Sequence, residues 1–163
     1  MEKLPFNKTQ GRVNVQERLR ILNNKQFHAV LATDADGQPY TSLVAFALAP
    51  DMEGALFATP KKTSKYRNIM KNRNVSLMID TRSNGAKGYM RSEAVTILGS
   101  ALTLRKGKKR DALAEVLISK HPRMEAFVRA ASTALVLVSF TKVLHTGRFQ
   151  SVTEWEPKKL TAL

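Results

Sequence analysis

A segment near the middle of the chain has the side chains and the spacing of an anion-binding site. Thr59, Ser64, Lys65 and Arg67 lie where an apolar run ends and a short helix is predicted to begin. The first N–H groups of a helix have no partner within it, and the positive end of the helix dipole lies at the same place. Hydroxyls and cations at this position predict a phosphate site. The alternative is ordinary capping by Thr63 or Ser64, with the cations in solvent.

The composition narrows the class of protein that holds this segment. A chain of 163 residues indicates one domain, residues 1–163. The absence of cysteine excludes disulfides, thiolate metal sites and thiol nucleophiles, and fits a reducing compartment. The N-terminus lacks the apolar core of a signal peptide, and no apolar run approaches the roughly 20 residues that span a bilayer. We therefore expect a soluble cytoplasmic protein without membrane contact, in which residues 1–13 form a flexible arm or one that embraces a dimer partner.

The net charge of +14 makes polyanions attractive partners in general. Five of the six residues from Arg105 to Arg110 are cationic. No aromatic side chains are interleaved with them for base stacking, and no nucleic-acid-binding motif surrounds them. We interpret the run as a solvated turn that leads into a helix. Association with nucleic acid remains open on charge alone but is not favoured.

The sequence shows no constellation of catalytic or metal-binding side chains. His28, His121 and His145 are widely separated and lack the spacing of metal ligands, so structural roles are favoured for them. The thirteen carboxylates form no pair that suggests acid–base catalysis. No metal site is predicted, and the catalytic residues stay unknown.

Hydrophobic periodicity places the phosphate segment among strands. It predicts amphipathic helices over 15–25 and 110–120, with a short helical piece over 124–129. It predicts strands over 27–33, 40–48, 55–59, 75–79, 94–104 and 134–144. The Asp-Gly pair at 36–37 predicts a β-hairpin, and Gly99 predicts a bulge or a barrel corner. In the short helix after Thr63, a stripe of Tyr66, Ile69 and Met70 is predicted to face the core.

This order of elements excludes a Rossmann fold. Strands and helices do not alternate, and the phosphate turn lacks the glycines of dinucleotide-binding and P-loop motifs. We predict a mainly β fold with peripheral helices, in which six antiparallel strands close into a barrel and leave no exposed edge.

Five short motifs in this order carry a resemblance to a known family. They are Gly37-Gln38-Pro39-Tyr40, Leu56-Phe57-Ala58-Thr59, Thr63-Ser64-Lys65, Asn72-Arg73-Asn74-Val75-Ser76-Leu77 and Ile97-Leu98-Gly99-Ser100-Ala101. Together they resemble the pyridoxamine 5′-phosphate oxidase-like proteins, the FMN-binding split barrels. The resemblance implies a six-stranded antiparallel split β-barrel that holds FMN at a homodimer interface.

The resemblance also implies which residues would hold the cofactor. Lys65 would meet the FMN phosphate, helped by Ser64 and by the hydroxyl of Thr59. Arg67 lies two residues past Lys65 and could reach the same group, because an Arg fork matches phosphate geometry.

On the second strand, Ser42, Leu43 and Val44 would flank the isoalloxazine ring. Residues near Glu93–Thr96 and the tail around Trp155 would complete the pocket from the other subunit. For Trp155, packing into a subunit interface is the alternative role.

The implied function is that of an FMN-dependent oxidoreductase acting on an unidentified small molecule. Ser42 and Ser64 stand where the vitamin B6 oxidases carry arginines, so the resemblance does not extend to their substrate. A non-catalytic flavin-binding module is the first alternative. The Arg67-Asn68 and His121-Pro122 pairs and the stretch His145–Phe149 also look like the heme-utilisation branch, which suggests a heme-binding module. A deazaflavin cofactor and a basic nucleic-acid-associated barrel complete the alternatives.

Overall fold

The computed structural model describes residues 13–83, 85–147 and 151–158. Its strands are β1 (His28–Ala35), β2 (Gln38–Leu48), β3 (Gly54–Pro60), β4 (Asn74–Asp80), β5 (Ala94–Thr103), β6 (Thr133–Gly147) and β7 (Ser151–Trp155). Its α-helices are α1 (Val15–Lys25), α2 (Ser64–Lys71), α3 (Lys108–Lys120) and α4 (Glu125–Arg129), with 3₁₀ turns η1 (Tyr89–Arg91) and η2 (Pro122–Met124). The expected N-terminal arm lies almost wholly outside the described residues.

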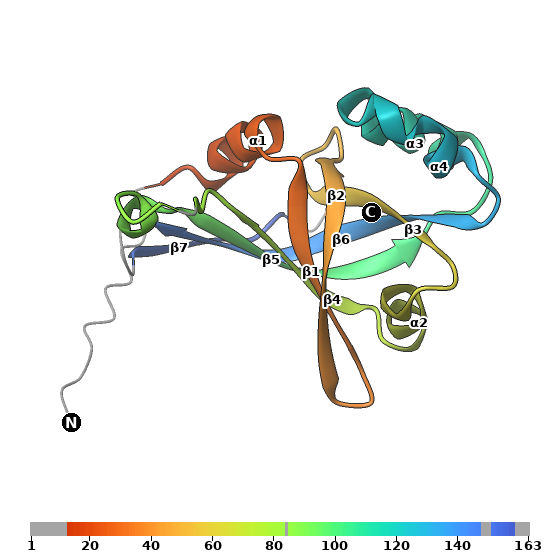
Figure 1. Ribbon diagram of the computed structural model, residues 1–163, viewed down its shortest axis with the longest axis horizontal. Helices are drawn as coiled ribbons and strands as arrows, with labels where there is room; N and C mark the ends of the chain where they lie inside the picture. The colour runs from red at the N-terminus through yellow and green to blue at the C-terminus, as the bar shows by residue number, and fades with distance from the viewer. Residues whose placement is uncertain (1–12, 84, 148–150, 159–163) are drawn as a thin grey trace.

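Six of the strands close into an antiparallel ring. In the order β1, β2, β3, β6, β5, β4, each strand hydrogen-bonds to the next, and β4 returns to β1. The predicted six-stranded antiparallel barrel is therefore confirmed. The seventh strand, β7, was not predicted; it pairs with β6 outside the ring, beyond the part of β6 that β3 occupies (Figure 1).

Alternating side chains fill the barrel. β4 buries Val75, Leu77 and Ile79 and turns the residues between them outward, as a half-buried strand must. Helix α1 adds Leu19 and Leu22, both fully buried, to the same apolar cluster. The barrel is thus a packed core rather than a channel.

Helices α3 and α4 cover one outer face of the barrel (Figure 1). Leu117 of α3 and Val128 of α4 pack against Leu56 of β3 and Leu135 of β6. Because this region of the sheet is covered on both faces, the first four residues of β3 and of β6 are all buried instead of alternating between buried and exposed. No helix in the described part of the chain is both long and apolar enough to cross a membrane.

Two local predictions from glycine are confirmed. Asp36 and Gly37 both have positive φ (59° and 77°), as the two central residues of a tight β1–β2 hairpin require. At Gly99, the register between β5 and β6 shifts, which marks a bulge. A Cβ at Gly99 would lie 2.5 Å from the carbonyl oxygen of Ser139, so glycine permits the close approach of the two strands.

Lys120, at the end of α3, gives the fold a predictable pH dependence. Its Nζ lies 3.7 Å from the centre of the Phe46 ring and donates to Asn23 Oδ1 at 3.1 Å. Burial lowers the pKa of Lys120 to about 8, from an ordinary value of 10.5. Between these values the unfolded chain binds more protons than the folded one, so Lys120 makes the free energy of unfolding rise with pH.

We therefore expect Lys120→Met to flatten the rise in unfolding free energy between pH about 8 and about 10. Urea denaturation across this range measures it. The control is Lys109→Met on the exposed side of the same helix, which should keep the wild-type slope. Identical slopes for both variants and the wild type would contradict the assignment.

Candidate functional site

The start of α2 is built around Thr63. Its hydroxyl caps the helix by accepting from the Tyr66 N–H at 3.3 Å, and it lies 2.9 Å from the hydroxyl of Thr59. Thr59 is almost fully buried at the end of β3. The hydroxyl of Thr59, which was predicted to help hold the phosphate, therefore lies beneath the turn and contacts the residue that caps the helix.

The predicted cationic residues differ in how they are held. Arg67 is exposed and folds back, donating to the carbonyl oxygen of Lys62 at 2.8 Å and to Ser64 Oγ at 3.1 Å. Lys65 is half-buried, and its ammonium makes no hydrogen bond or ion pair with any described residue. Lys65 is thus the predicted cation that is available to an anion, while Arg67 orients Ser64.

Hydrogen bonds tie α2 to the β1–β2 hairpin. Asn68 Nδ2 donates to Thr33 Oγ1 at 3.1 Å, and that hydroxyl lies 3.5 Å from the carbonyl oxygen of Tyr40 on β2. At the far end of the helix, Lys71 pairs with Asp36 in the hairpin turn. The first turn of α2 is therefore held in a fixed place relative to β2.

The structure corrects one prediction for α2. Ile69 is buried and Tyr66 is partly buried, but Met70 is 63% exposed. The face that turns toward the barrel carries Ile69, Tyr66 and Asn68, the last of which bonds to Thr33 on β1. A helix of two turns has room for one narrow buried stripe, and Met70 lies outside it.

β2 carries the three predicted ring-binding residues on an open edge. β3 pairs only with Phe46–Leu48, so the backbone from Gln38 to Ala45 has a described strand partner on the β1 side alone. Val44 is buried, and Leu43 is 62% exposed. Ser42 Oγ is fully buried, and none of the described residues gives it a hydrogen-bond partner. Such an orphaned hydroxyl is costly and marks a place where a ligand could supply the missing partner.

An apolar patch lies on the outer face of the barrel beside this edge. Val30 stands directly opposite both Leu43 and Met78 in the register, so their side chains share one face. With Phe27, which is 60% exposed, they line a cavity of about 240 Å³. Phe27 and Leu43 are exposed and Val30 and Met78 are half-buried, and a contiguous apolar patch of this kind is typical of an interaction surface.

Trp155 and the residues near Glu93–Thr96, which the resemblance assigns to the second subunit's side of the pocket, do not lie on α2 or β2. Trp155 is half-buried on β7 and packs against the barrel core. In Figure 1, β7 and α2 lie at opposite ends of the molecule. Trp155 therefore belongs to a strand other than those that carry the remaining predicted cofactor-binding residues.

Glu93 is the centre of an internal ionic network. It accepts from Arg18 Nε at 3.0 Å and Nη2 at 2.5 Å, and His145 Nε2 lies 2.9 Å from Oε2. Burial alone would raise the pKa of Glu93, but the hydrogen bonds from Arg18 and His145 outweigh it and lower the pKa. The network joins α1, β6 and the segment before β5, so Glu93 has a structural role in this chain.

The other two histidines differ from each other in environment. His121 is buried, with Nε2 2.8 Å from the carbonyl oxygen of Phe46, while His28 is exposed at the start of β1. Among the described residues, no three of His, Cys, Asp or Glu come close enough together to hold a metal ion.

Two features of the site could not be predicted from the sequence. One is the unpartnered hydroxyl of Ser42, which only the packing around β2 reveals. The other is the Asn68–Thr33–Tyr40 contact, which needs the β1–β2 register and the helix position together. No pattern within the sequence signals either of them.

Comparison with known proteins gives one family. A family model described as pyridoxamine 5′-phosphate oxidase matches residues 15–147. No curated protein matches the chain by sequence.

Several solved structures share the fold. A heme binding protein from Mycobacterium smegmatis superposes with a TM-score of 0.77 at 17% identity, over 90% of this chain and 59% of that protein. HutZ, a heme storage protein from Vibrio cholerae, gives 0.62 at 18% identity, over 78% of this chain and 91% of that one. An FAD-binding protein from Mesorhizobium loti gives 0.63 at 15% identity, over 78% and 90%. The chain thus spans less than two thirds of the mycobacterial protein, and at these identities the likeness concerns the fold.

Proposed function

The chain belongs to the pyridoxamine 5′-phosphate oxidase family, and from this premise we propose that it binds FMN between α2 and the open edge of β2. The observation that carries the proposal is that two polar groups lack described partners and lie on elements that hydrogen bonds connect. Among the described residues, Ser42 Oγ on β2 is buried without a hydrogen-bond partner, and the ammonium of Lys65 at the start of α2 has no counter-ion. The residues present therefore fit a ligand that brings a phosphate and hydrogen-bonding atoms.

Each part of the site has a distinct task in this proposal. Lys65 and the free N–H groups of the first turn of α2 hold the phosphate. Thr63 and Arg67 hold that turn in shape through the contacts described above. The unpaired backbone of β2 around Leu43 offers N–H and C=O groups to the ring, and Ser42 offers its hydroxyl.

FMN supplies electron transfer when it is bound, and the protein supplies binding, orientation and electrostatics. A chain without a recognisable acid–base constellation is compatible with such a division of work. We propose an oxidoreductase that acts on a small molecule.

A homodimer completes the proposed site. The patch of Phe27, Val30, Leu43 and Met78 adjoins the open edge of β2, so a second copy seated on it would also enclose the ring. In that arrangement, Trp155 and the residues near Glu93–Thr96 of the partner approach the ring.

Titration of the purified chain with FMN tests the proposal. We expect quenching of flavin fluorescence, a two-band flavin absorption spectrum in the retained fraction, and a dimer by sedimentation. A protein that stays colourless and leaves flavin fluorescence unchanged would refute FMN binding. A parallel titration with a deazaflavin distinguishes that cofactor.

Ser42→Ala separates a ligand-binding role from a structural one. Removing an unpartnered buried hydroxyl should leave the free energy of unfolding unchanged or slightly higher. FMN affinity should fall by about fivefold, because one hydrogen bond to the cofactor is lost. Ser139→Ala on the exposed side of β6 is the control and should change neither quantity. Unchanged FMN affinity in Ser42→Ala would remove this hydroxyl from the site.

Heme binding is the second candidate, favoured by relatives described as heme binding and heme storage proteins. His121 and His145 are buried and engaged, so the exposed His28 is the available axial ligand among the three histidines. Titration with hemin should then give one intense band in the violet that shifts in His28→Ala. If the absorption band is the same in His28→Ala as in the wild type, any heme uptake is nonspecific.

A further inference from the structure

A second concave site lies between the barrel and the helices α3 and α4. It is a cavity of about 380 Å³, a size within the range of small-molecule sites. Its lining includes five cations, Lys61, Arg105, Lys106, Arg110 and Arg129, and no carboxylate among the described residues. Such a concentration of one sign of charge in a concave place attracts anions.

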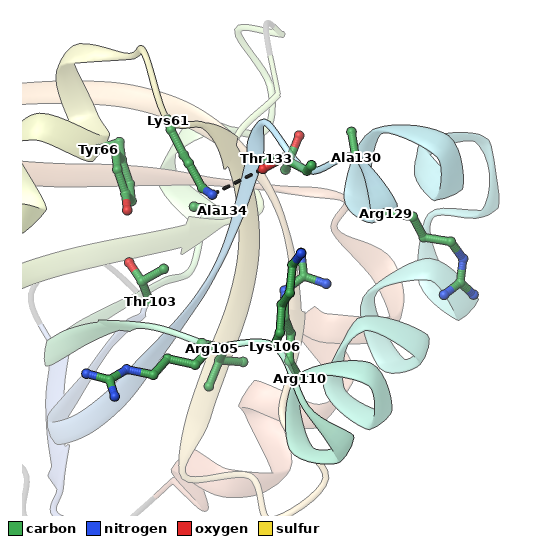
Figure 2. A pocket seen from close by; sticks show the side chains of 12 residues that line it. Lys61, Tyr66, Thr103, Arg105, Lys106, Arg110, Arg129, Ala130, Thr133 and Ala134 are labelled. Carbon is green, nitrogen blue, oxygen red and sulfur yellow. Dashed lines mark hydrogen bonds between the residues drawn. The ribbon is translucent and has the colours of Figure 1, made fainter.

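Three of these cations extend toward the cavity. Figure 2 shows Lys61, Lys106 and Arg110 reaching toward the enclosed space, while Arg105 and Arg129 point away from it. The guanidinium of Arg129 is already engaged with Glu115 and Glu125. The positive charge available to a ligand therefore comes from Lys61, Lys106 and Arg110.

These three cations are only weakly engaged. Lys61 Nζ donates to the carbonyl oxygen of Ala131 at 3.1 Å, and Arg110 Nη2 donates to that of Val128 at 3.3 Å. Lys106 makes no hydrogen bond or ion pair with any described residue. A phosphate oxygen accepts a shorter and stronger hydrogen bond than a neutral carbonyl does, so it can recruit all three groups.

An independent observation points to a ligand at the same place. Thr103 Oγ1, on the cavity wall at the end of β5, is fully buried and has no hydrogen-bond partner in the described part of the chain. In Figure 2 the hydroxyls of Thr103 and Tyr66 turn toward each other across the cavity. Beside them, Leu104, Ala131 and Ala134 give the wall an apolar part. The wall thus combines polar groups that lack partners with apolar surface.

This cavity is separate from the proposed FMN site. Of α2 it includes Tyr66 alone, and its lining contains neither Ser64 nor Lys65 nor any residue of β2. The residues that carry the two proposals are therefore different.

We propose that the cavity binds a small phosphorylated molecule. The phosphate lies against Lys61, Lys106 and Arg110, and the remainder of the molecule lies against Thr103, Tyr66 and the apolar wall. A concave site of this size suits a small molecule better than a polynucleotide, which needs a long charged groove and stacking side chains.

An NMR titration of the full-length protein, first without FMN and then with FMN in excess, tests the proposal, with inorganic phosphate and phenyl phosphate as probes. Both should shift the amide signals of Thr103, Lys106 and Ala134. Phenyl phosphate should bind more tightly than inorganic phosphate, because its ring reaches the apolar wall. Shifts confined to Ser64 and Lys65 would overturn the proposal, since the probes would then be competing for the FMN site.

Matched variants make the test specific. Lys106→Gln should lower the affinity for phenyl phosphate by about fivefold. Lys109→Gln removes the same charge from an exposed residue outside the cavity and should lower it by less than about twofold. Thr103→Val should weaken binding without lowering the thermal stability, because the hydroxyl has no partner to lose.

Two outcomes would refute the proposal. Equal losses in Lys106→Gln and Lys109→Gln would mean diffuse attraction by the net charge. A single-stranded oligonucleotide that binds more tightly than phenyl phosphate and also shifts Lys108 and Lys109 would mean a polyanion surface. Lys65→Ala should leave phenyl phosphate binding here unchanged, so a failure of the FMN proposal can be told apart from a failure of this one.

Discussion

Replacing Lys65 with alanine is expected to weaken FMN binding by more than about tenfold, since a charge-assisted phosphate contact contributes about 1.5–3 kcal/mol. The loss should be large because, of the two predicted cations, Lys65 is the one whose ammonium has no partner among the described residues. Arg67 is held by Lys62 and Ser64 and would have to leave both to replace it. Fluorescence quenching by the apoprotein measures the dissociation constant directly.

Lys62→Ala is the matched control for this substitution. Lys62 lies in the same turn and is exposed, and its contact with Arg67 uses the backbone oxygen, which the substitution keeps. It should change FMN affinity by less than about twofold, as expected for one screened surface charge. Both variants should unfold at the wild-type urea concentration. Equal affinity of Lys65→Ala and wild type would remove Lys65 from the site.

Local sequence signals were sufficient for most elements of the fold. The Asp-Gly turn at 36–37 has the positive φ values that the residue types require, and the bulge at Gly99 follows from the absence of a side chain. The closed ring was also predicted, since closure removes exposed edges. These features depend on residues close in sequence or on a general rule about sheets.

The features that escaped prediction depend on distant parts of the chain. β7 is a strand because β6 extends to Gly147 and leaves an edge beyond β3, and nothing within Ser151–Trp155 alone indicates that edge. Met70 has the spacing of a core residue, but the position of α2 against β1 turns it outward.

The same distinction applies to the two candidate sites. Thr59, Ser64 and Lys65 of the proposed FMN site lie within a few residues of each other, so their types and spacing were readable, whereas the unpartnered hydroxyl of Ser42 was not. The cavity at Lys61 exists because β3 pairs with β6, which brings Pro60 opposite Thr133, and because β5 pairs with β6, which brings Thr103 opposite Val136. The cationic run from Arg105 to Arg110 is, as predicted, an exposed turn that leads into a helix, α3; only the strand pairing shows that Lys106 and Arg110 also line the cavity.

Both sites depend on the barrel, and the close approach of β5 and β6 at Gly99 can be tested by adding one methyl group. Gly99→Ala should lower the free energy of unfolding by about 2–3 kcal/mol. The added Cβ would lie 2.5 Å from the carbonyl oxygen of Ser139 and 2.7 Å from Val138 Cγ1. The first of these neighbours is backbone in the paired strand β6, so the β5–β6 pairing must open to relieve the clash.

Gly85→Ala provides the control for this substitution, because a Cβ there meets no atom within 4 Å. It should change the free energy of unfolding by no more than about 0.5 kcal/mol. Urea denaturation of both FMN-free variants at one protein concentration makes the comparison. If Gly99→Ala is as stable as Gly85→Ala, the bulge beside Thr141 can absorb a side chain, and Gly99 is not what sets the spacing of β5 and β6. If it is destabilised as expected, the close approach at Gly99 is required to hold β5, and with it Thr103, in the closed barrel.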